Sequence, residues 1–534
     1  MSMNRRAALR GMAGAIVTAA TAGSAGIVQN AKAADLKVIR MAPQADLKIL
    51  DPIWTTAFIT RNHAYMIYDT LFGIDAQGAI KPQMVSTYKT SADFKTWTFT
   101  LRPGLAFHDG KPVTTADVIQ SLKRWGQRDS LGQLMFAAMG SITPVDAKTF
   151  TMQFNDVFGM VLEALSKPSA NAPFIMPERV AMTSADTQIS DTTGSGPYIF
   201  AKDEYRPGDR IVYLKNPKYV SRDEPPSGTA GGKPVFIDRM EWVILKDAQT
   251  QASALTSGQI DMIEWLPAEQ FPAMKADPNV ALIQQMPSSM VGLHMNHLLP
   301  PFDNPKISQA AIMSINQAAL MRAQQVYPQL YDLCTSIYPC GSTYASDKTS
   351  YFTGKPQFAK ARALLKEANY DGTPIALMWP TDFAVINKYA PVMKALLEQS
   401  GFKVDMQSVD WTTLVTRRAK MDPVAQGGWN MFLTGWSAAD QINPLYFAPM
   451  SGNGKKGWFG WPTDPKLVDL KAQFVRSTDP AQKKALAAEI QEEVFNAGIY
   501  GTVGEYVTLV ALRKDRVSGL VKGPVGVYWG LKRA

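Results

Sequence analysis

The sequence predicts an α/β protein whose helices pack on layered sheets. Segments with the apolar spacing of a helix are followed directly by segments with the alternation of a strand, several times along the chain. Apolar residues make up 46% and charged residues 19% of the 534 residues, a balance that excludes a disordered or fibrous chain. At about 150 residues per domain, this length corresponds to roughly three or four domain-sized units.

The N-terminus has the three parts of an export signal. A basic start with the twin arginine Arg5 and Arg6 precedes a weakly apolar stretch rich in Ala, Gly and Thr, and small residues end it before a cleavage site between Ala33 and Ala34. The stretch has few large aliphatic residues, which argues against the alternative of an uncleaved membrane anchor. We expect residues 1–33 to be a signal peptide and the mature protein to be periplasmic. The twin arginine favours the Tat route over the Sec route.

The first clear elements of the mature chain are a strand over 97–101 and a helix that begins after Thr114. The strand alternates apolar and polar residues, and Gly-containing turns follow it. Asp117 lies three residues after Thr114, so the two side chains form a capping pair at the start of the helix. The Pro- and Gly-rich stretch 224–234 predicts a surface loop.

The second half of the chain predicts further helices. Helical spacing is most regular over 304–319, where an asparagine can cap and a proline occupies the first helical position, so one continuous helix is expected. The same spacing recurs over 357–370. A helix from 388 to 401 leads directly into a strand over 402–411. The last helix begins after Asp479.

Charge and cysteine content restrict the partners. The formal net charge of +9 falls to +5 without Arg5, Arg6 and the two other basic residues that precede residue 34, which is too dilute to indicate nucleic-acid binding. In an oxidising compartment Cys334 and Cys340 can close a small loop as a disulfide. A free reactive pair and half of a metal site are the alternatives, although the chain has no further cysteine.

Motifs for catalysis or for metal binding are absent from the sequence. There is no G-x-S-x-G nucleophile elbow and no phosphate-binding G-x-x-x-x-G-K-[ST] loop. His294 and His297 lie three residues apart in and just after a predicted strand over 290–296, which places their side chains on opposite faces. We therefore expect no catalytic residue, no metal and no cofactor.

Tryptophans in Gly-rich, turn-like segments are the remaining candidates for a binding site. They are Trp54, Trp379, Trp429, Trp436, Trp458 and Trp461. Large aromatic residues line ligand clefts, and they also fill protein cores. The segment 429–447 differs from the others because its tryptophans stand among Gly, Asp and Asn residues that are typical of loops.

Motifs in a fixed order along the mature chain carry a resemblance to a known family. They are 97–125, with its Arg-Pro-Gly turn and Phe-His-Asp-Gly, then Gly-Ser-Gly-Pro-Tyr at 194–198, Asn-Pro-Lys-Tyr at 216–219, Gly-Gln-Ile-Asp at 258–261, the segment 295–303 ending in Pro-Pro-Phe-Asp, 359–370 and 429–436. With these motifs the chain resembles the bacterial extracellular solute-binding proteins of family 5, the periplasmic receptors of oligopeptide, dipeptide and nickel ABC importers.

The resemblance implies a two-lobed periplasmic binding protein fold that closes around a ligand at a hinge. Lobe I would comprise 34–80, 197–292 and 505–534, an extra domain 81–196, and lobe II 293–504. The implied function is a monomeric receptor that captures a peptide or peptide-like solute and delivers it to an ABC permease with its ATPase subunits.

The resemblance also implies ligand-binding residues. Asp440, shortly after Gly435 and Trp436, would pair with the α-amino group of the ligand; an aspartate that caps a helix or turn is the other interpretation. Trp54 and Thr55 are lining candidates by position.

Trp379 stands where dipeptide receptors offer an arginine for the ligand carboxylate, and this departure leaves other ligands open. The alternatives are an opine, a glycan, a modified amino acid or a nickel chelate. A secreted hydrolase on a similar frame is the rival from another class, and it requires a nucleophile and base that the sequence does not reveal.

Overall fold

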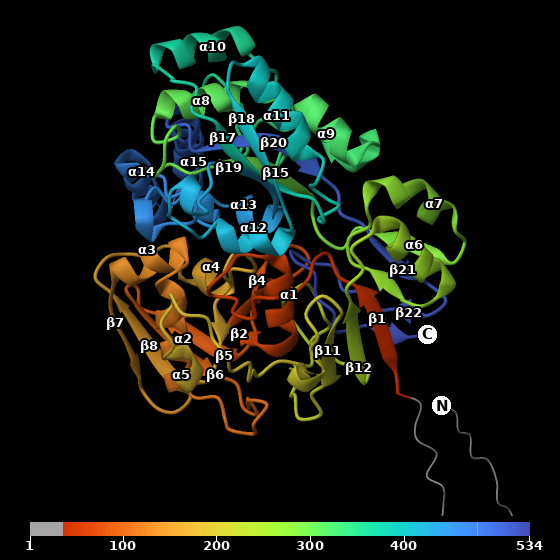
Figure 1. Cartoon of the computed structure of the whole chain (residues 1–534). Helices are drawn as coiled ribbons and strands as arrows, with labels where there is room; N and C mark the ends of the chain where they lie inside the picture. Colours follow the sequence, from red (N-terminus) through yellow and green to blue (C-terminus); the bar gives the residue numbers. More distant parts are fainter. Residues whose placement is uncertain (1–35, 478) are drawn as a thin grey trace, which may run out of the picture. The chain divides into compact units, whose positions relative to one another are not determined.

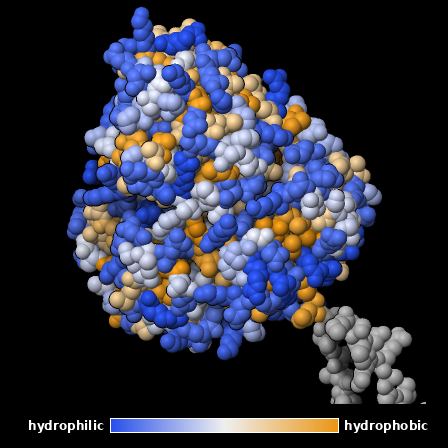
Figure 2. Space-filling model, viewed as in Figure 1, coloured by the Kyte–Doolittle hydropathy of each residue, from blue (hydrophilic) through white to orange (hydrophobic). Residues whose placement is uncertain are grey.

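A computed structural model of the chain describes residues 36–477 and 479–534 (Figure 1). The predicted signal peptide, residues 1–33, lies outside the described residues. No helix within the described part of the chain is both long and apolar enough to cross a membrane. On the face shown in Figure 2, apolar residues are scattered in small groups among polar ones.

Among the described residues, three sheets have four or more strands. A seven-stranded sheet has the order β10 (Tyr198–Phe200), β11 (Arg210–Lys215), β12 (Arg239–Val243), β1 (Val38–Ala42), β13 (Met262–Ile263), β21 (Val510–Arg513) and β14 (Val280–Ile283). A six-stranded sheet has the order β16 (Tyr331–Asp332), β20 (Tyr500–Tyr506), β15 (Ser289–Met295), β19 (Met431–Ser437), β17 (Ile375–Pro380) and β18 (Val404–Val409). A four-stranded sheet, orange in Figure 1, has the order β5 (Val85–Thr90), β6 (Thr96–Leu101), β8 (Thr149–Phe154) and β7 (Met139–Pro144).

Short strand pairs and helices complete the described fold. The pairs are β2 (Asp69–Thr70) with β9 (Phe174–Ile175), β3 (Phe72–Ile74) with β4 (Ile80–Pro82), and β22 (Val517–Ser518) with β23 (Lys532–Arg533). The helices are α1 (Phe58–Ile67), α2 (Thr115–Gly126), α3 (Ser130–Ala138), α4 (Val161–Ser166), α5 (Glu178–Ala181), α6 (Ala248–Ser257), α7 (Phe271–Ala276), α8 (Pro305–Met313), α9 (Gln317–Gln325), α10 (Phe358–Glu367), α11 (Tyr389–Gln399), α12 (Trp411–Arg417), α13 (Ala438–Gln441), α14 (Pro465–Arg476) and α15 (Pro480–Asn496).

The chain passes between the seven-stranded and the six-stranded sheet twice. It leaves β14 for β15 through 284–288, and it returns from β20 to β21 through 507–509. In the six-stranded sheet β17 runs parallel to β18 across α11, which is the β-α-β arrangement of an α/β fold. Two short crossing segments are therefore the only links in sequence between these two sheets within the described residues.

Helices with local capping signals form where the sequence predicts them. The side chains of Thr114 and Asp117 make the capping box of α2, and Asp479 accepts hydrogen bonds from two backbone N–H groups at the start of α15. The helices predicted over 357–370 and 388–401 are confirmed as α10 and α11, and the strand predicted over 402–411 is confirmed as β18.

The single helix predicted over 304–319 is wrong, because the chain forms two helices there. α8 ends before Ser314, and Asn316 caps the following helix α9 by accepting a hydrogen bond from the Ala319 N–H at 3.1 Å. The Ser314 hydroxyl bonds to the Ser400 hydroxyl at 2.7 Å, a contact from distant sequence that holds the break. Apolar spacing continues through the break because both helices bury one face.

Two of the motifs quoted above contact each other. His108 donates its backbone N–H to the Gly194 carbonyl oxygen at 2.8 Å, and its Nδ1 accepts the Gly194 N–H at 3.2 Å. Gly194 packs so tightly on α1 that a Cβ atom there would lie 1.7 Å from the Ile67 carbonyl oxygen. The backbone-to-backbone approach explains why the motif requires glycine.

Replacing Gly194 by alanine is therefore expected to lower the free energy of unfolding by about 3 kcal/mol, because the clash is with backbone and cannot be relieved by a rotamer change. Urea denaturation measures this loss. Gly526→Ala is the matched control, since the nearest atom to its added Cβ would be 3.4 Å away, an ordinary contact. Equal losses in both variants would contradict the packing explanation.

Candidate ligand-binding site

Several cavities of the described chain lie between residues 36–283 and residues 289–506, among them two that contain predicted site residues. The smaller cavity has a volume of ≈ 20 Å³. Its lining from residues 36–283 includes Thr56, Ala57, Phe58 and Trp265. Its lining from residues 289–506 includes Phe383, Trp411, Arg418, Thr434, Gly435, Trp436 and Tyr506. The larger, of ≈ 1240 Å³, is lined by Trp54, Thr56, Arg128, Asn171, Asp186, Lys455, Lys456, Trp458, Phe459 and Trp461, among others. We call them the narrow cavity and the wide cavity. Thr56 lines both, so they adjoin at this residue.

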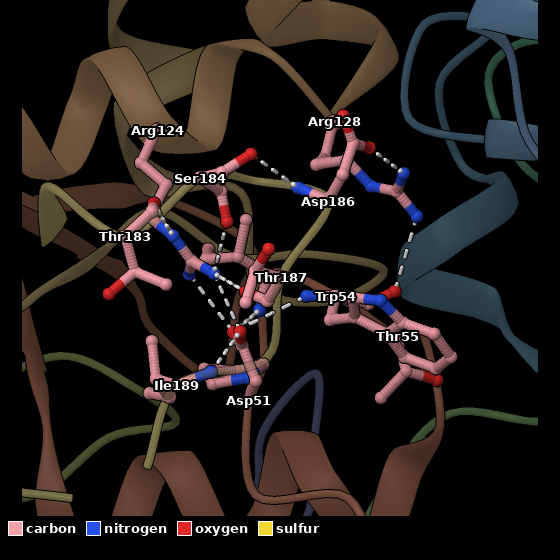
Figure 3. Close-up of polar contacts among 12 residues, drawn as sticks. Asp51, Trp54, Thr55, Arg124, Arg128, Thr183, Ser184, Asp186, Thr187 and Ile189 are labelled. Atoms are coloured by element: carbon pink, nitrogen blue, oxygen red, sulfur yellow. Dashed lines mark hydrogen bonds and ion pairs between the residues drawn. The ribbon is translucent and has the colours of Figure 1, made fainter. Parts of the chain in front are cut away.

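The segment that carries Trp54 and Thr55 is held by a buried ion pair (Figure 3). Asp51 accepts the Ile53 and Trp54 N–H groups at 3.0 and 3.4 Å. Its carboxylate also accepts two hydrogen bonds from Arg124, at 3.0 and 2.6 Å. Both side chains are 1% exposed or less, so the pair is fully desolvated. Trp54 lines the wide cavity, and Thr55 is buried beside Arg418.

Asp440 is fully buried, and one of its two carboxylate oxygens accepts a hydrogen bond. Oδ2 accepts the Ser437 N–H at 3.2 Å and completes the capping box of α13. Oδ1 has no hydrogen-bond partner among residues 36–477 and 479–534. Burial raises the pKa of Asp440 to about 6, against the opposing effect of the Arg61 charge. The capping interpretation is thus correct for one oxygen, and the other oxygen is left for a further donor.

Arg61, on α1, supplies positive charge opposite Asp440. Its guanidinium donates to Ser169 Oγ at 2.7 Å and to Asn62 Oδ1 at 2.9 Å, and lies 4.4 Å from the centre of the Phe58 ring. Phe58 also lines the narrow cavity. Arg61 therefore reaches the narrow cavity only through Phe58, and Asp440 is not among the described residues that line the narrow or the wide cavity.

Gly435 and Trp436 line the narrow cavity from the end of β19. A Cβ atom on Gly435 would lie 2.3 Å from the Tyr506 hydroxyl, so glycine lets that phenol approach the strand. Trp436 donates its Nε1–H to His294 Nε2 at 2.9 Å. This bond gives His294 a structural role, while His297 lies beyond the end of the strand, where its Nδ1 bonds to the Phe302 carbonyl oxygen at 3.2 Å.

Trp379 is not brought together with the other predicted site residues. It lies on β17, where its Nε1–H donates to the Asn387 carbonyl oxygen at 2.6 Å, and it is not among the described residues that line the narrow or the wide cavity. Trp429 is completely buried and packs on Phe432, so it belongs to the core.

Arg418 is a candidate site residue that no sequence motif indicated. It directly follows α12, is 2% exposed, and lines the narrow cavity. Trp411, Leu414 and Arg418 share the helical spacing of one buried face, and an arginine on such a face was the available signal. Burial lowers the pKa of Arg418 to about 9.

Cys334 and Cys340 form a disulfide in the structure, with their Cα atoms 5.9 Å apart. The Cys340 N–H donates to a carboxylate oxygen of Glu505 at 2.5 Å. Because both sulfurs are joined, the alternatives of a free thiol pair and of half a metal site do not apply to this structure.

The seven-stranded and the six-stranded sheet are linked by two crossings, and the cavities lie between their two sides of the chain. This arrangement defines a binding protein of the cleft type. Residues 79–458 match the family described as bacterial extracellular solute-binding proteins, family 5 Middle, and the chain belongs to this family.

Relatives agree with this assignment. A probable peptide ABC transporter periplasmic-binding protein of Sinorhizobium fredii (strain NBRC 101917 / NGR234) is 36% identical over 490 residues, which are 91% of this chain and 92% of that protein. Two solved structures share the fold. The dipeptide binding protein from Pseudoalteromonas sp. SM9913 in complex with Met-Leu has a TM-score of 0.76 at 19% identity, covering 93% of this chain and 100% of its own. The binding protein AgaA from A. tumefaciens R10 in complex with agropinic acid has a TM-score of 0.75 at 21% identity, covering 93% and 99%. The predicted α/β, two-lobed fold and the predicted family are confirmed.

Proposed function

We propose that this chain is the periplasmic receptor of an ABC importer, that it has no catalytic activity, and that it captures a peptide or peptide-like solute as a monomer. It delivers that solute to a permease with its ATPase subunits. The observation that carries the proposal is the buried Oδ1 of Asp440, which lacks a donor within the described chain and belongs to α13, the short helix that directly follows the cavity-lining residues Gly435 and Trp436. An ammonium group there would pair strongly with the carboxylate, because water is excluded.

The proposal includes the three structural units and the export signal. The seven-stranded sheet supports a lobe I built from three chain segments, and the four-stranded sheet supports an inserted domain within 81–196. The bounds expected at 292/293 and 504/505 fall inside β15 and β20, so we move them to the crossings 284–288 and 507–509. Cleavage between Ala33 and Ala34 would release the mature receptor.

A solute other than a peptide is the second candidate ligand class. Its basis is the position of Trp379, which stands where an arginine was expected and does not line either cavity described above. An opine, a modified amino acid, a glycan or a nickel chelate are the members of this class, and one relative of the same fold was solved with agropinic acid.

Native mass spectrometry of protein purified without refolding tests the proposed function. A series of copurified peptide masses is the expected result. One defined non-peptide mass would replace the peptide by a member of the second ligand class. Turnover of a peptide substrate that is abolished by a single point change would overturn the receptor function.

The affinity for an amine-bearing ligand is expected to rise with pH between 5 and 7 and to fall again above about 8, where an α-amino group loses its proton. Burial raises the pKa of Asp440 to about 6, so the carboxyl group is mostly protonated at pH 5 and cannot pair with an ammonium group. The expected change between pH 5 and 7 is about tenfold in Kd. Titration calorimetry at several pH values measures it, and the same slope in Asp440→Asn would assign the titration to another group.

A further inference from the structure

Arg418 is a buried guanidinium that has no anionic partner among the described residues. Within the described chain its side-chain contacts are long hydrogen bonds from Nη2 to the hydroxyls of Thr55 and Thr56, at 3.5 and 3.4 Å, and Nε has no acceptor. Arg124 is equally buried, yet it meets the Asp51 carboxylate with two hydrogen bonds. A buried cation without such a partner is costly, so the protein retains it at the expense of stability.

The surroundings of Arg418 leave the edge of its guanidinium available. Its Cζ atom lies 5.4 Å from the centre of the Trp458 ring and 5.3 Å from that of Phe459. Aromatic rings stabilise a guanidinium without accepting its N–H hydrogen bonds in the plane. The Thr56 hydroxyl, which accepts the Trp458 Nε1–H at 3.1 Å, is too far from Arg418 for a strong bond.

Arg418 also lies where a ligand would contact both sides of the cleft. It lines the narrow cavity with Gly435 and Trp436, while Thr56, from the opposite side, lines the narrow and the wide cavity. An anion bound here would join residues from two chain segments more than 350 residues apart in sequence. Such a ligand contact stabilises the closed arrangement, because it is made only when both sides meet.

We propose that Arg418 binds a carboxylate group of the ligand. The planar guanidinium presents paired N–H donors that match the two oxygens of a carboxylate. This inference rests on the proposed function, and it narrows the ligand class: a ligand with an ammonium group at Asp440 and a carboxylate at Arg418 is a zwitterion. Peptides with a free C-terminus and amino-acid derivatives meet this requirement, whereas neutral glycans do not.

The experiment compares ligands with and without the carboxylate. The probes are a random dipeptide mixture and the same mixture amidated at its C-termini, and the proteins are wild type, Arg418→Met and Lys420→Met. Lys420 is exposed and two residues away, so its variant removes the same charge without altering the cavity. We expect wild type and Lys420→Met to bind the free acids at least about thirtyfold more tightly than the amides, and Arg418→Met to lose this preference.

The outcomes separate the inference from the proposed function. Equal affinity for acids and amides in wild type, or an unchanged preference in Arg418→Met, would overturn the inference and leave a peptide receptor. If wild type binds neither mixture, the proposed peptide function is wrong. Carboxylate binding by Arg418 is then tested by comparing the Tm in acetate with the Tm in acetamide at constant ionic strength. A carboxylate-specific rise in Tm that Arg418→Met abolishes supports it, and no such rise overturns it.

A conservative variant covers the case in which Arg418→Met does not fold. Arg418→Lys keeps the charge but loses the paired donors, so a reduced preference for the free acids is expected. An unchanged preference in Arg418→Lys would assign Arg418 a structural role against the aromatic rings and overturn the inference.

Discussion

Replacing Asp440 by asparagine is expected to weaken the binding of an amine-bearing ligand by well over tenfold. The substitution keeps the size of the side chain and removes only the charge that pairs with the ammonium group, and losing one partner of a buried charge pair costs about 2 kcal/mol or more. The ligand-free protein is expected to keep its Tm, because burial already raises the pKa of Asp440 to about 6 and disfavours its charged form. Titration calorimetry and thermal melting measure the two effects.

Asp186→Asn is the matched control for this prediction. Asp186 lines the wide cavity, but its side chain is 84% exposed and pairs with Arg128 at 3.0 Å. Its replacement is expected to change the affinity less than threefold, since exposed ion pairs are worth roughly 1 kcal/mol or less. An Asp440→Asn protein with unchanged affinity and a lowered Tm would reduce Asp440 to the cap of α13.

Replacing Asp51 by asparagine is expected to lower the free energy of unfolding by about 3 to 5 kcal/mol. The change leaves the Arg124 guanidinium buried without an anion, which is the costly way to break a buried ion pair. It also weakens the hydrogen bonds that hold Trp54 in place (Figure 3), so ligand affinity should fall with stability. Urea denaturation followed by tryptophan fluorescence measures the loss.

Two further proteins make the Asp51 prediction specific. The double variant Asp51→Asn with Arg124→Met is expected to be more stable than Asp51→Asn alone, because it also removes the unpaired charge. Asp186→Asn, the exposed pair, should lose less than about 1 kcal/mol. If the double variant has a lower free energy of unfolding than Asp51→Asn alone, then Arg124 stabilises the protein through the packing of its side chain and not through its charge.

Local signals made much of the fold predictable. The caps at Thr114 and Asp479 lie within three residues of the helix starts they specify, and strand alternation over 97–101 is equally local. The break between α8 and α9 was missed because its cause is partly remote: Ser314 bonds to Ser400, which is 86 residues away. Apolar periodicity reports that a face is buried, but it does not report where the axis of a helix changes.

The candidate site was only partly predictable for the same reason. Gly435, Trp436 and Asp440 belong to one segment, and that segment could be identified from its motif. Arg418 has no motif, and it becomes a site residue only because the fold places it against the hydroxyls of Thr55 and Thr56. Trp379 is the opposite case. Its position in the sequence corresponds to a ligand-binding arginine of dipeptide receptors, yet its side chain does not line the narrow or the wide cavity.

The sequence by itself determined the α/β class, the capped helices, the family and the segment around Asp440, because each depends on residues that are near one another in the chain. The tertiary structure alone decided which charges lack partners. Whether Asp440 Oδ1 and the Arg418 guanidinium find hydrogen-bond partners within the chain depends on groups from chain segments hundreds of residues away. Those groups come near only after the sheets have packed. Burial then sets the cost of each charge that has no partner among the described residues, and that cost is why we propose these two residues as ligand contacts.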